Sequence, residues 1–181
     1  IEYLDYDDEA SWASKEFEHD LYTTTAPEDW VQVDGVEHGL QNGTFLLPPD
    51  IDMDNFRFEP NVALEMIDSN PHAQGGERDY SLPEVQQDLF ASLRVSTYSK
   101  MGGLSDLEFS VLESKIGYVY IATFKRSNDQ LTMYQTTYYV MNPDWQLVVN
   151  AAYFSEDSQP SVNEVARHAI NTFPQINRLL F

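Results

Sequence analysis

Three aspartates alternate with other residues at Asp50, Asp52 and Asp54, and this spacing resembles the first half of a calcium-binding loop. An EF-hand loop also requires Gly at its sixth position and a bidentate Glu at its twelfth. Asn55 and Asn61 occupy those two positions. We therefore interpret the run as an acidic surface turn and predict no metal site.

Other catalytic and cofactor-binding motifs are missing from the sequence. The four histidines, at positions 19, 38, 72 and 168, lack the spacing that places two of them on one helical face, and no Gly-x-Ser-x-Gly turn occurs. The glycine pairs at 75–76 and 102–103 lack the context of a phosphate-binding loop, and the chain has no Cys. We predict no catalytic residue and no cofactor. Because 30 acids could still bring two carboxylates together in space, a hydrolase with an unrecognised carboxylate pair stays as an alternative.

Four tyrosines offer a contact surface. Strand alternation puts Tyr118 and Tyr120 on one face of their strand, and it puts Tyr134 and Tyr138 on one face of another. If Val119 and Ile121 pack under the helices, the tyrosines look outward, where an apolar ring with a polar tip suits binding. We predict a protein-binding or peptide-binding face at these four residues. The alternative is that they pack across strands or lie beneath the N-terminal segment.

The elements that position these residues follow from hydrophobic periodicity and turn residues. Strands are predicted at 30–33, 43–47, 61–67, 107–116, 118–125, 131–141 and 145–154. One helix begins at the Ser81–Glu84 capping box, and a second begins at Ser161–Glu164 and ends at Pro174. The order of three strands, a helix, four strands and a helix predicts an α+β fold: an antiparallel sheet of about six or seven strands with the helices packed on one face.

The negative charge is concentrated in the first half of the chain. Of the 181 residues, 30 are acidic and 10 basic, which gives a net charge of -20, and residues 1–80 hold 20 of the acids but only 3 of the bases. We predict an acidic, aromatic-containing leader over residues 1–24 and a single α+β domain over residues 25–181. Within the leader, the spacing of Trp12, Phe17 and Leu21 predicts a short amphipathic helix around Ala10–His19 that docks on the body or on a partner.

This charge excludes two classes of partner. Nucleic acids and anionic membranes both attract basic proteins, so we expect neither nucleic-acid binding nor direct membrane insertion. No stretch reaches the length of a membrane span, and the sequence begins without a signal peptide. We expect a soluble protein of the cytoplasm or of the cell envelope.

Four segments together suggest a known fold: the opening Ala26–Trp30, the segment Phe56–Leu64 before and within the third strand, the strand containing Gln135, and the last aromatic strand before the C-terminal helix. In these segments the chain resembles the PsbP-like superfamily, and most closely the small actinobacterial proteins of the LpqN lipoprotein type and DcrB-like proteins. The similarity covers about residues 25–175, and the acidic leader departs from it. It implies a non-enzymatic scaffold, and export if a signal has been removed.

We therefore expect a non-catalytic protein-interaction or chaperone-like domain with a protein or peptide partner, bound by its sheet face or by its acidic leader. An alternative is an acidic mimic of nucleic acid that blocks a basic site on another protein, which requires the leader to fold onto the body.

Overall fold

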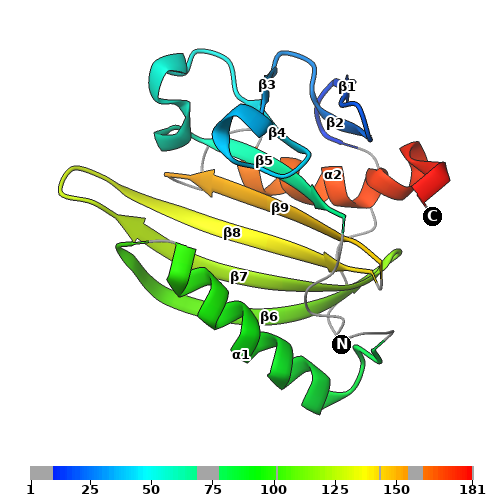
Figure 1. The fold of residues 1–181 in the computed structure, drawn as a ribbon. Helices are drawn as coiled ribbons and strands as arrows, with labels where there is room; N and C mark the ends of the chain where they lie inside the picture. The colour runs from blue at the N-terminus through cyan, green and yellow to red at the C-terminus, as the bar shows by residue number, and fades with distance from the viewer. Residues whose placement is uncertain (1–9, 69–77, 101, 143, 155–160, 181) are drawn as a thin grey trace.

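The computed structural model describes residues 10–68, 78–100, 102–142, 144–154 and 161–180 (Figure 1). The strands and helices follow in the order β1 (Ser14–Glu18), β2 (Thr23–Pro27), β3 (Val31–Asp34), β4 (Gly43–Leu47), β5 (Asn61–Ile67), α1 (Pro83–Lys100), β6 (Leu104–Ser114), β7 (Gly117–Ser127), β8 (Thr132–Met141), β9 (Gln146–Tyr153) and α2 (Val162–Ile176). Three short 3-10 helices, η1 (Val36–His38), η2 (Met53–Phe58) and η3 (Arg178–Leu180), lie in the connections and near the end of the chain.

A seven-stranded antiparallel sheet forms the body of the protein. Its strand order is β3-β4-β5-β9-β8-β7-β6, so β5 at the end of the first group of strands pairs with β9 at the end of the second. Short turns join the long strands β6 to β9. In the β7–β8 turn, for example, the Asn128 carboxamide oxygen accepts hydrogen bonds from the backbone N–H groups of Gln130 and Leu131 at 2.9 Å each. The predicted antiparallel α+β fold is confirmed.

The two long helices lie on opposite faces of this sheet. Val119 and Ile121 of β7 belong to the apolar cluster that contains the buried face of α2. Tyr120, between them in sequence, packs with Leu89 and Leu93 of α1 on the other face. The prediction that both helices pack on one face is therefore wrong. Both faces of β7 carry large apolar or aromatic side chains, so each face requires its own cover.

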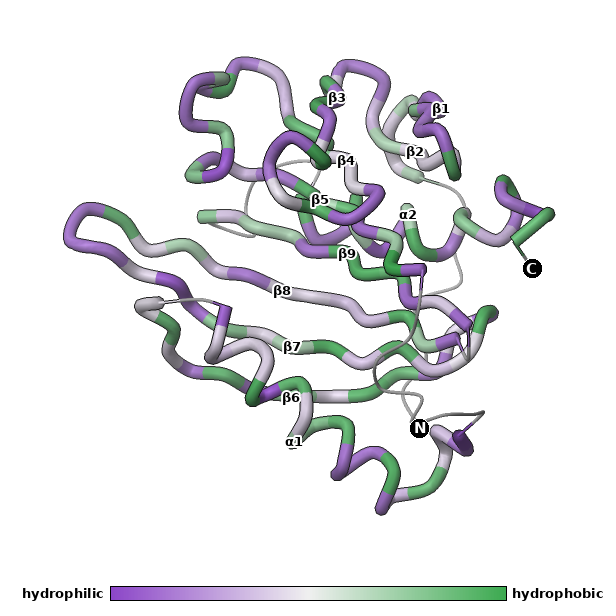
Figure 2. The backbone as a smooth tube through the Cα atoms, viewed as in Figure 1, coloured by the Kyte–Doolittle hydropathy of each residue, from purple (hydrophilic) through white to green (hydrophobic). Residues whose placement is uncertain are grey.

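The two helices differ in how much of their surface they bury. Nine residues of α2 are buried, from Val162 to Phe173, whereas α1 buries only Leu89, Leu93 and Thr97. Figure 2 shows hydrophilic segments recurring along the whole length of α1. The helix α1 is thus a partial cover that leaves part of its face of the sheet open. No helix in the described ranges is both long and apolar enough to cross a membrane.

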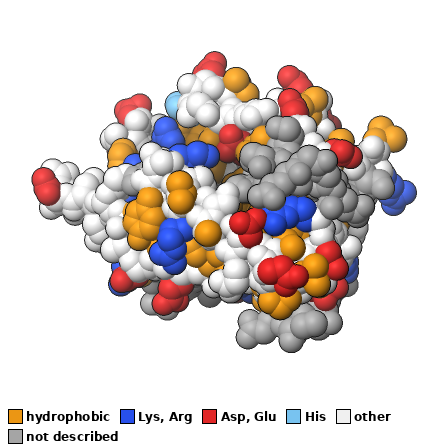
Figure 3. Space-filling view, turned by 60° about the horizontal axis from the view of Figure 1, so that its bottom comes forward, with side chains coloured by type: hydrophobic (Ala, Val, Ile, Leu, Met, Phe, Trp, Pro, Cys, Tyr) orange, Lys and Arg blue, Asp and Glu red, His pale blue; other side chains and the backbone are white. Residues whose placement is uncertain are grey.

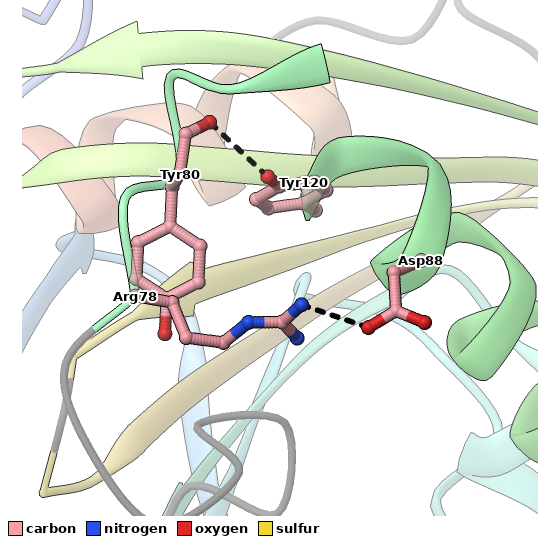
Figure 4. A network of polar contacts seen from close by, with 4 residues as sticks. All are labelled: Arg78, Tyr80, Asp88 and Tyr120. Atoms are coloured by element: carbon pink, nitrogen blue, oxygen red, sulfur yellow. Dashed lines mark hydrogen bonds and ion pairs between the residues drawn. The ribbon is translucent and has the colours of Figure 1, made fainter. Parts of the chain in front are cut away.

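Polar contacts attach the N-terminal end of α1 to the sheet (Figure 4). A guanidinium nitrogen of Arg78 donates a hydrogen bond to Oδ2 of Asp88 on the helix at 2.8 Å. The Tyr120 hydroxyl of β7 donates to the backbone carbonyl of Tyr80 at 3.4 Å, and Nε2 of Gln86 donates to the same carbonyl at 3.0 Å. One backbone carbonyl therefore connects the start of α1 to β7, the strand next to the sheet edge.

The N-terminal segment forms a β-hairpin, and the predicted helix over Ala10–His19 is wrong. Strands β1 and β2 pair in antiparallel register, with Phe17 opposite Thr24. Phe17 is buried while its neighbours Glu16 and Glu18 are exposed, which is the period of a strand. A β-branched run, Thr23–Thr25, supplies the pairing strand. The part of the leader before residue 10 lies outside the described residues.

The hairpin is docked on α2. Phe17 and Tyr22 are buried in the same apolar cluster as Phe173 of α2. The Asn177 carboxamide accepts a hydrogen bond from the Thr23 N–H and donates one to the Thr23 carbonyl, both at 2.8 Å. The boundary predicted between residues 24 and 25 falls inside β2, so it does not separate two structural units.

The end of α2 also differs from the prediction. The helix passes through Pro174 and ends at Ile176. Proline cannot donate to the carbonyl four residues before it. Asn177 nevertheless closes the last turn, because its backbone N–H and its Nδ2 both donate to the Phe173 carbonyl at 3.0 and 2.9 Å.

Candidate functional site

The central strands are left partly open on the face that carries α1. At one end of the sheet, α1 packs against residues of β6 and β7 such as Phe109 and Tyr120. At the other end, Phe56 of η2 packs on Phe45 of β4 with a centroid distance of 5.0 Å. Between these covers lies a cleft of about 550 Å³ with walls from α1, η2 and the two residues after η1, Gly39 and Leu40, and a floor from β5, β9, β8 and β7. Ligand-binding clefts commonly have volumes of about 300 to 1,000 Å³.

Small side chains on neighbouring strands create the hollow in the floor. Ala63 of β5 lies opposite Asn150 of β9, and Ala152 of β9 lies opposite Gln135 of β8. All four side chains line the cleft. Because cross-strand neighbours on one face are only about 5 Å apart, two alanines in adjacent rows lower the floor by the depth of a larger side chain.

The floor carries buried polar groups, some with hydrogen-bond partners and one without. The Thr137 hydroxyl donates to Oδ1 of Asn150 at 2.7 Å, so this pair is satisfied. Gln135 is only 5% exposed, and its Oε1 is buried without a hydrogen-bond partner. A buried polar atom without a partner costs free energy, and native proteins contain few of them. Gln135 thus holds an unused hydrogen-bond acceptor under the floor of the cleft.

Tyr139 of β8 lines the cleft on the side of α1. Burial raises the pKa of this phenol, and the nearby negative charge of Glu65 acts in the same direction. Its hydroxyl therefore stays protonated well above neutral pH and can donate a hydrogen bond.

The charge of the cleft is opposite to that of the protein. Arg57, Lys100 and Arg126 line it, whereas Glu65 is the only acid among its described lining residues. Oε1 of Glu65 accepts a hydrogen bond from the backbone N–H of Gln41 at 2.8 Å. Figure 3, in which the bottom of Figure 1 comes forward, shows basic side chains lying among hydrophobic ones. The cleft can attract an anionic group although the chain carries a net charge of -20.

A second, smaller hollow of about 350 Å³ adjoins the first. Arg57 and Arg126 line both hollows, and Phe58, Leu131 and Met133 supply apolar surface to the second. The two arginines therefore stand between two partly apolar depressions.

The four tyrosines predicted to share a binding face do not form one. Tyr118 and Tyr120 lie on the α1 face, and Tyr134 and Tyr138 lie on the opposite face with α2. Tyr120 and Tyr138 are fully buried, as the packing alternative expected. The Tyr138 hydroxyl donates to Oδ1 of Asn163 and accepts from Nε of Arg167 on α2.

Tyr134 is the exposed member of the predicted set, at 40% exposure. Its ring stacks on Tyr153 with a centroid distance of 6.1 Å, and Nζ of Lys125 lies 5.5 Å from the centre of its ring. Tyr134 remains a contact candidate on the α2 face, away from the cleft.

The acidic turn and the histidines have structural partners. Asp52 caps η2, because its Oδ1 accepts from the Asp54 N–H at 3.1 Å and its Oδ2 accepts from Asn55 Nδ2 at 3.1 Å. His38 packs edge-on against Phe56, and His168 packs edge-on against Trp12. In the described ranges, no group of three His, Asp or Glu side chains is arranged to hold a metal ion. His72 and the Gly75–Gly76 pair lie outside the described residues.

Sequence reasoning missed the cleft and its three bases. Arg57, Lys100 and Arg126 come from η2, α1 and β7, so no local motif joins them. Gln135 lies in a strand that the family resemblance had named, but nothing in the sequence marks its carboxamide as unpaired.

No protein-family model matches the chain, and no curated protein matches it by sequence. Solved structures with a similar fold include two that match nearly the whole chain. Cyanobacterial PsbP (CyanoP) from Synechocystis sp. PCC 6803 has a TM-score of 0.53 and 10% sequence identity over 91% of this chain and 93% of its own. A protein of unknown function from Pseudomonas aeruginosa has a TM-score of 0.51 and 10% identity over 88% of this chain and 95% of its own.

The architecture belongs to the α+β class with a seven-stranded antiparallel sheet between two helices. Within that class, the chain has the PsbP-like fold. The finer resemblance to LpqN-type and DcrB-like proteins stays a prediction.

Proposed function

We propose that the chain is a non-catalytic protein-interaction or chaperone-like domain. It binds an extended segment of a partner protein in the cleft. The observation that carries this proposal is the unpaired Oε1 of Gln135 at the floor of a half-open cleft. A peptide backbone presents N–H donors and carbonyl acceptors at regular spacing, and carboxamide side chains can complement both. A bound segment would satisfy Gln135 once the carboxamide rotates and brings Oε1 to the surface of the cleft.

The composition of the cleft supports binding rather than catalysis. Hydrolysis by a carboxylate pair needs two acids across the reacting bond. Among the described lining residues Glu65 is the sole acid, and it already accepts a hydrogen bond from Gln41. The hydrolase alternative therefore finds no support in this cleft.

Selection from a random heptapeptide display library on the immobilised protein tests the proposal. Selected peptides would be synthesised with a fluorophore, and their Kd measured by fluorescence anisotropy. Val148 is half-buried and lines the cleft, so Val148→Trp should fill it and raise Kd at least tenfold. Val31 is 46% exposed on the edge strand β3, outside the lining of the cleft, so Val31→Trp is the matched control and should leave Kd unchanged.

Two results would contradict the proposal. One is the failure of selection to yield any peptide that binds the folded protein. The other is equal binding by wild type and by a Val148→Trp variant whose thermal unfolding shows that it is folded.

A further inference from the structure

We infer that the occupant of the cleft is an acidic segment: an extended stretch of the partner with an Asp or Glu held by Arg57 and Arg126, and with apolar residues on both sides of it. This inference rests on the proposed function and names the chemistry of the partner.

The distribution of charge carries the first step. Acids outnumber bases three to one in this chain, 30 against 10, yet the described residues that line the cleft include three bases and one acid. The local surplus is positive on a protein whose net charge is -20. A ligand without negative charge would gain nothing from this reversal, whereas a carboxylate would be attracted specifically to the cleft.

The second step is that these bases are available. Elsewhere, Lys125 pairs with Asp106 at 3.2 Å and Arg78 pairs with Asp88 at 2.8 Å. Across the described part of the chain, Arg57, Lys100 and Arg126 form no ion pair. The guanidinium carbon of Arg57 lies 5.9 Å from the centre of the Phe45 ring, which holds it against the wall of the cleft. Three bases at one place with no acidic partner among the described residues, in a chain rich in acids, indicate that an external anion fills the role.

The third step is the position of the two arginines. They line both the larger hollow and the smaller one, so a chain that crosses them has a depression on each side. An extended chain advances about 3.3 Å per residue. Residues on either side of the acid could therefore enter the hollows, where Phe58 and Met133 offer apolar contacts on one side and Phe45 and Val148 on the other.

The chemistry of the bases fits a carboxylate. The guanidinium group is planar and donates paired hydrogen bonds to the two oxygens of a carboxylate. Lys100, at the C-terminal end of α1, adds a point charge from the opposite wall. The unpaired Gln135 amide can then bind the backbone of the same segment.

Charge-neutral variants of both partners test the inference. Peptides selected as above would be compared with versions in which each Asp or Glu is replaced by Asn or Gln. In the protein, Arg57→Gln, Lys100→Gln and Arg126→Gln would be measured singly and together. Lys15→Gln and Arg178→Gln remove bases from β1 and η3, outside the cleft, and serve as matched controls.

We expect the selected peptides to carry an acid flanked by apolar residues. An exposed ion pair contributes enough to change Kd by up to about fivefold, so each cleft variant should raise Kd by about this factor. The triple variant should raise it by about 50-fold or more, and the controls should leave it unchanged. Raising the salt concentration from 0.05 to 0.5 M should weaken binding to wild type but hardly to the triple variant.

The failure of this inference differs from the failure of the proposed function. If peptides bind in a way that Val148→Trp abolishes, but the amide versions and the triple variant bind as tightly as the originals, the acidic segment is refuted and the cleft remains a peptide site. If a simple dicarboxylate such as succinate displaces the peptides at an equal concentration, the site recognises a small anion, and the inference of a partner segment is overturned. If no peptide binds, both proposals fall.

Discussion

Replacing Gln135 by Met should make the ligand-free protein more stable and its binding of peptides weaker. Gln135 is 5% exposed on β8, and its Oε1 is buried without a partner. Met has a similar length and volume but carries no strongly polar atom, so the substitution removes the unpaired group and leaves little void.

The expected gain follows from the cost of the unpaired oxygen. A buried acceptor without a hydrogen bond costs about 1 to 3 kcal/mol. Because repacking of a new side chain takes back part of this, we expect Gln135→Met to raise the free energy of unfolding by about 1 to 2 kcal/mol. For a domain of this size, that corresponds to a rise in Tm of about 3 to 6 °C.

Urea unfolding and calorimetry measure both quantities, and Thr137→Val provides the matched control. Thr137 lies two residues along the same strand on the same face, but its hydroxyl donates to Asn150 at 2.7 Å. Removing this satisfied hydroxyl should lower stability by about 1 kcal/mol, because Oδ1 of Asn150 then loses its donor. The two substitutions should therefore change stability in opposite directions.

Binding supplies the second half of the prediction. The peptides selected on wild type should bind Gln135→Met about tenfold more weakly, which corresponds to about 1.4 kcal/mol. A loss of stability of 1 kcal/mol or more in Gln135→Met, with Thr137→Val behaving as expected, would refute the reasoning. It would mean that the amide is already satisfied in the free protein and is not held open for a ligand.

Two further predictions concern tyrosines. Burial raises the pKa of Tyr22 from 10.0 to about 12. The contribution of the neutral phenol to the free energy of unfolding is therefore fully present below pH 10 and is lost as pH rises towards 12. The pKa shift corresponds to about 3 kcal/mol. In urea unfolding between pH 9 and 11, Tyr22→Phe should lose less stability than wild type, and an identical loss would contradict this assignment. Tyr138→Ser should cost about 3 to 5 kcal/mol because the ring is fully buried, whereas Tyr134→Ser at 40% exposure should cost less than about 1 kcal/mol. Equal shifts in Tm for these two variants would show that the placement of the tyrosines is wrong.

The sequence was sufficient to predict the elements of the main sheet. The strands β3 to β9 and the order of the two helices follow from alternation, turn residues and helical spacing, all of which are local properties. The same local reasoning failed at the N-terminal hairpin. Trp12, Phe17 and Leu21 fit a helical spacing, but the pairing of β1 with Thr23–Thr25 determines the structure. Pairing between segments is not encoded in the spacing of one of them.

The arrangement of the faces could not be predicted from β7 alone. Tyr120 and Ile121 are both buried, on opposite faces, so alternation in this strand contains no signal for which face meets water. The cleft depends on still more distant relations. Its hollow floor requires Ala63 of β5 and Ala152 of β9 to lie on the same face of the sheet. Its positive charge requires Arg57 and Arg126, which are far apart in the sequence, to lie close together in the folded chain. These coincidences exist only in the folded chain.

The contact between Asn177 and Thr23 spans 154 positions and has a consequence for the order of synthesis. Phe17 and Tyr22 are translated before the main sheet, but Phe173, which packs in the same cluster, is translated after it. Until α2 has emerged, the apolar side of the hairpin has no surface to cover it. The hairpin is therefore translated before the main sheet but covered only after it, and during that interval its aromatic side chains are accessible to chaperones, to proteases and to other nascent chains.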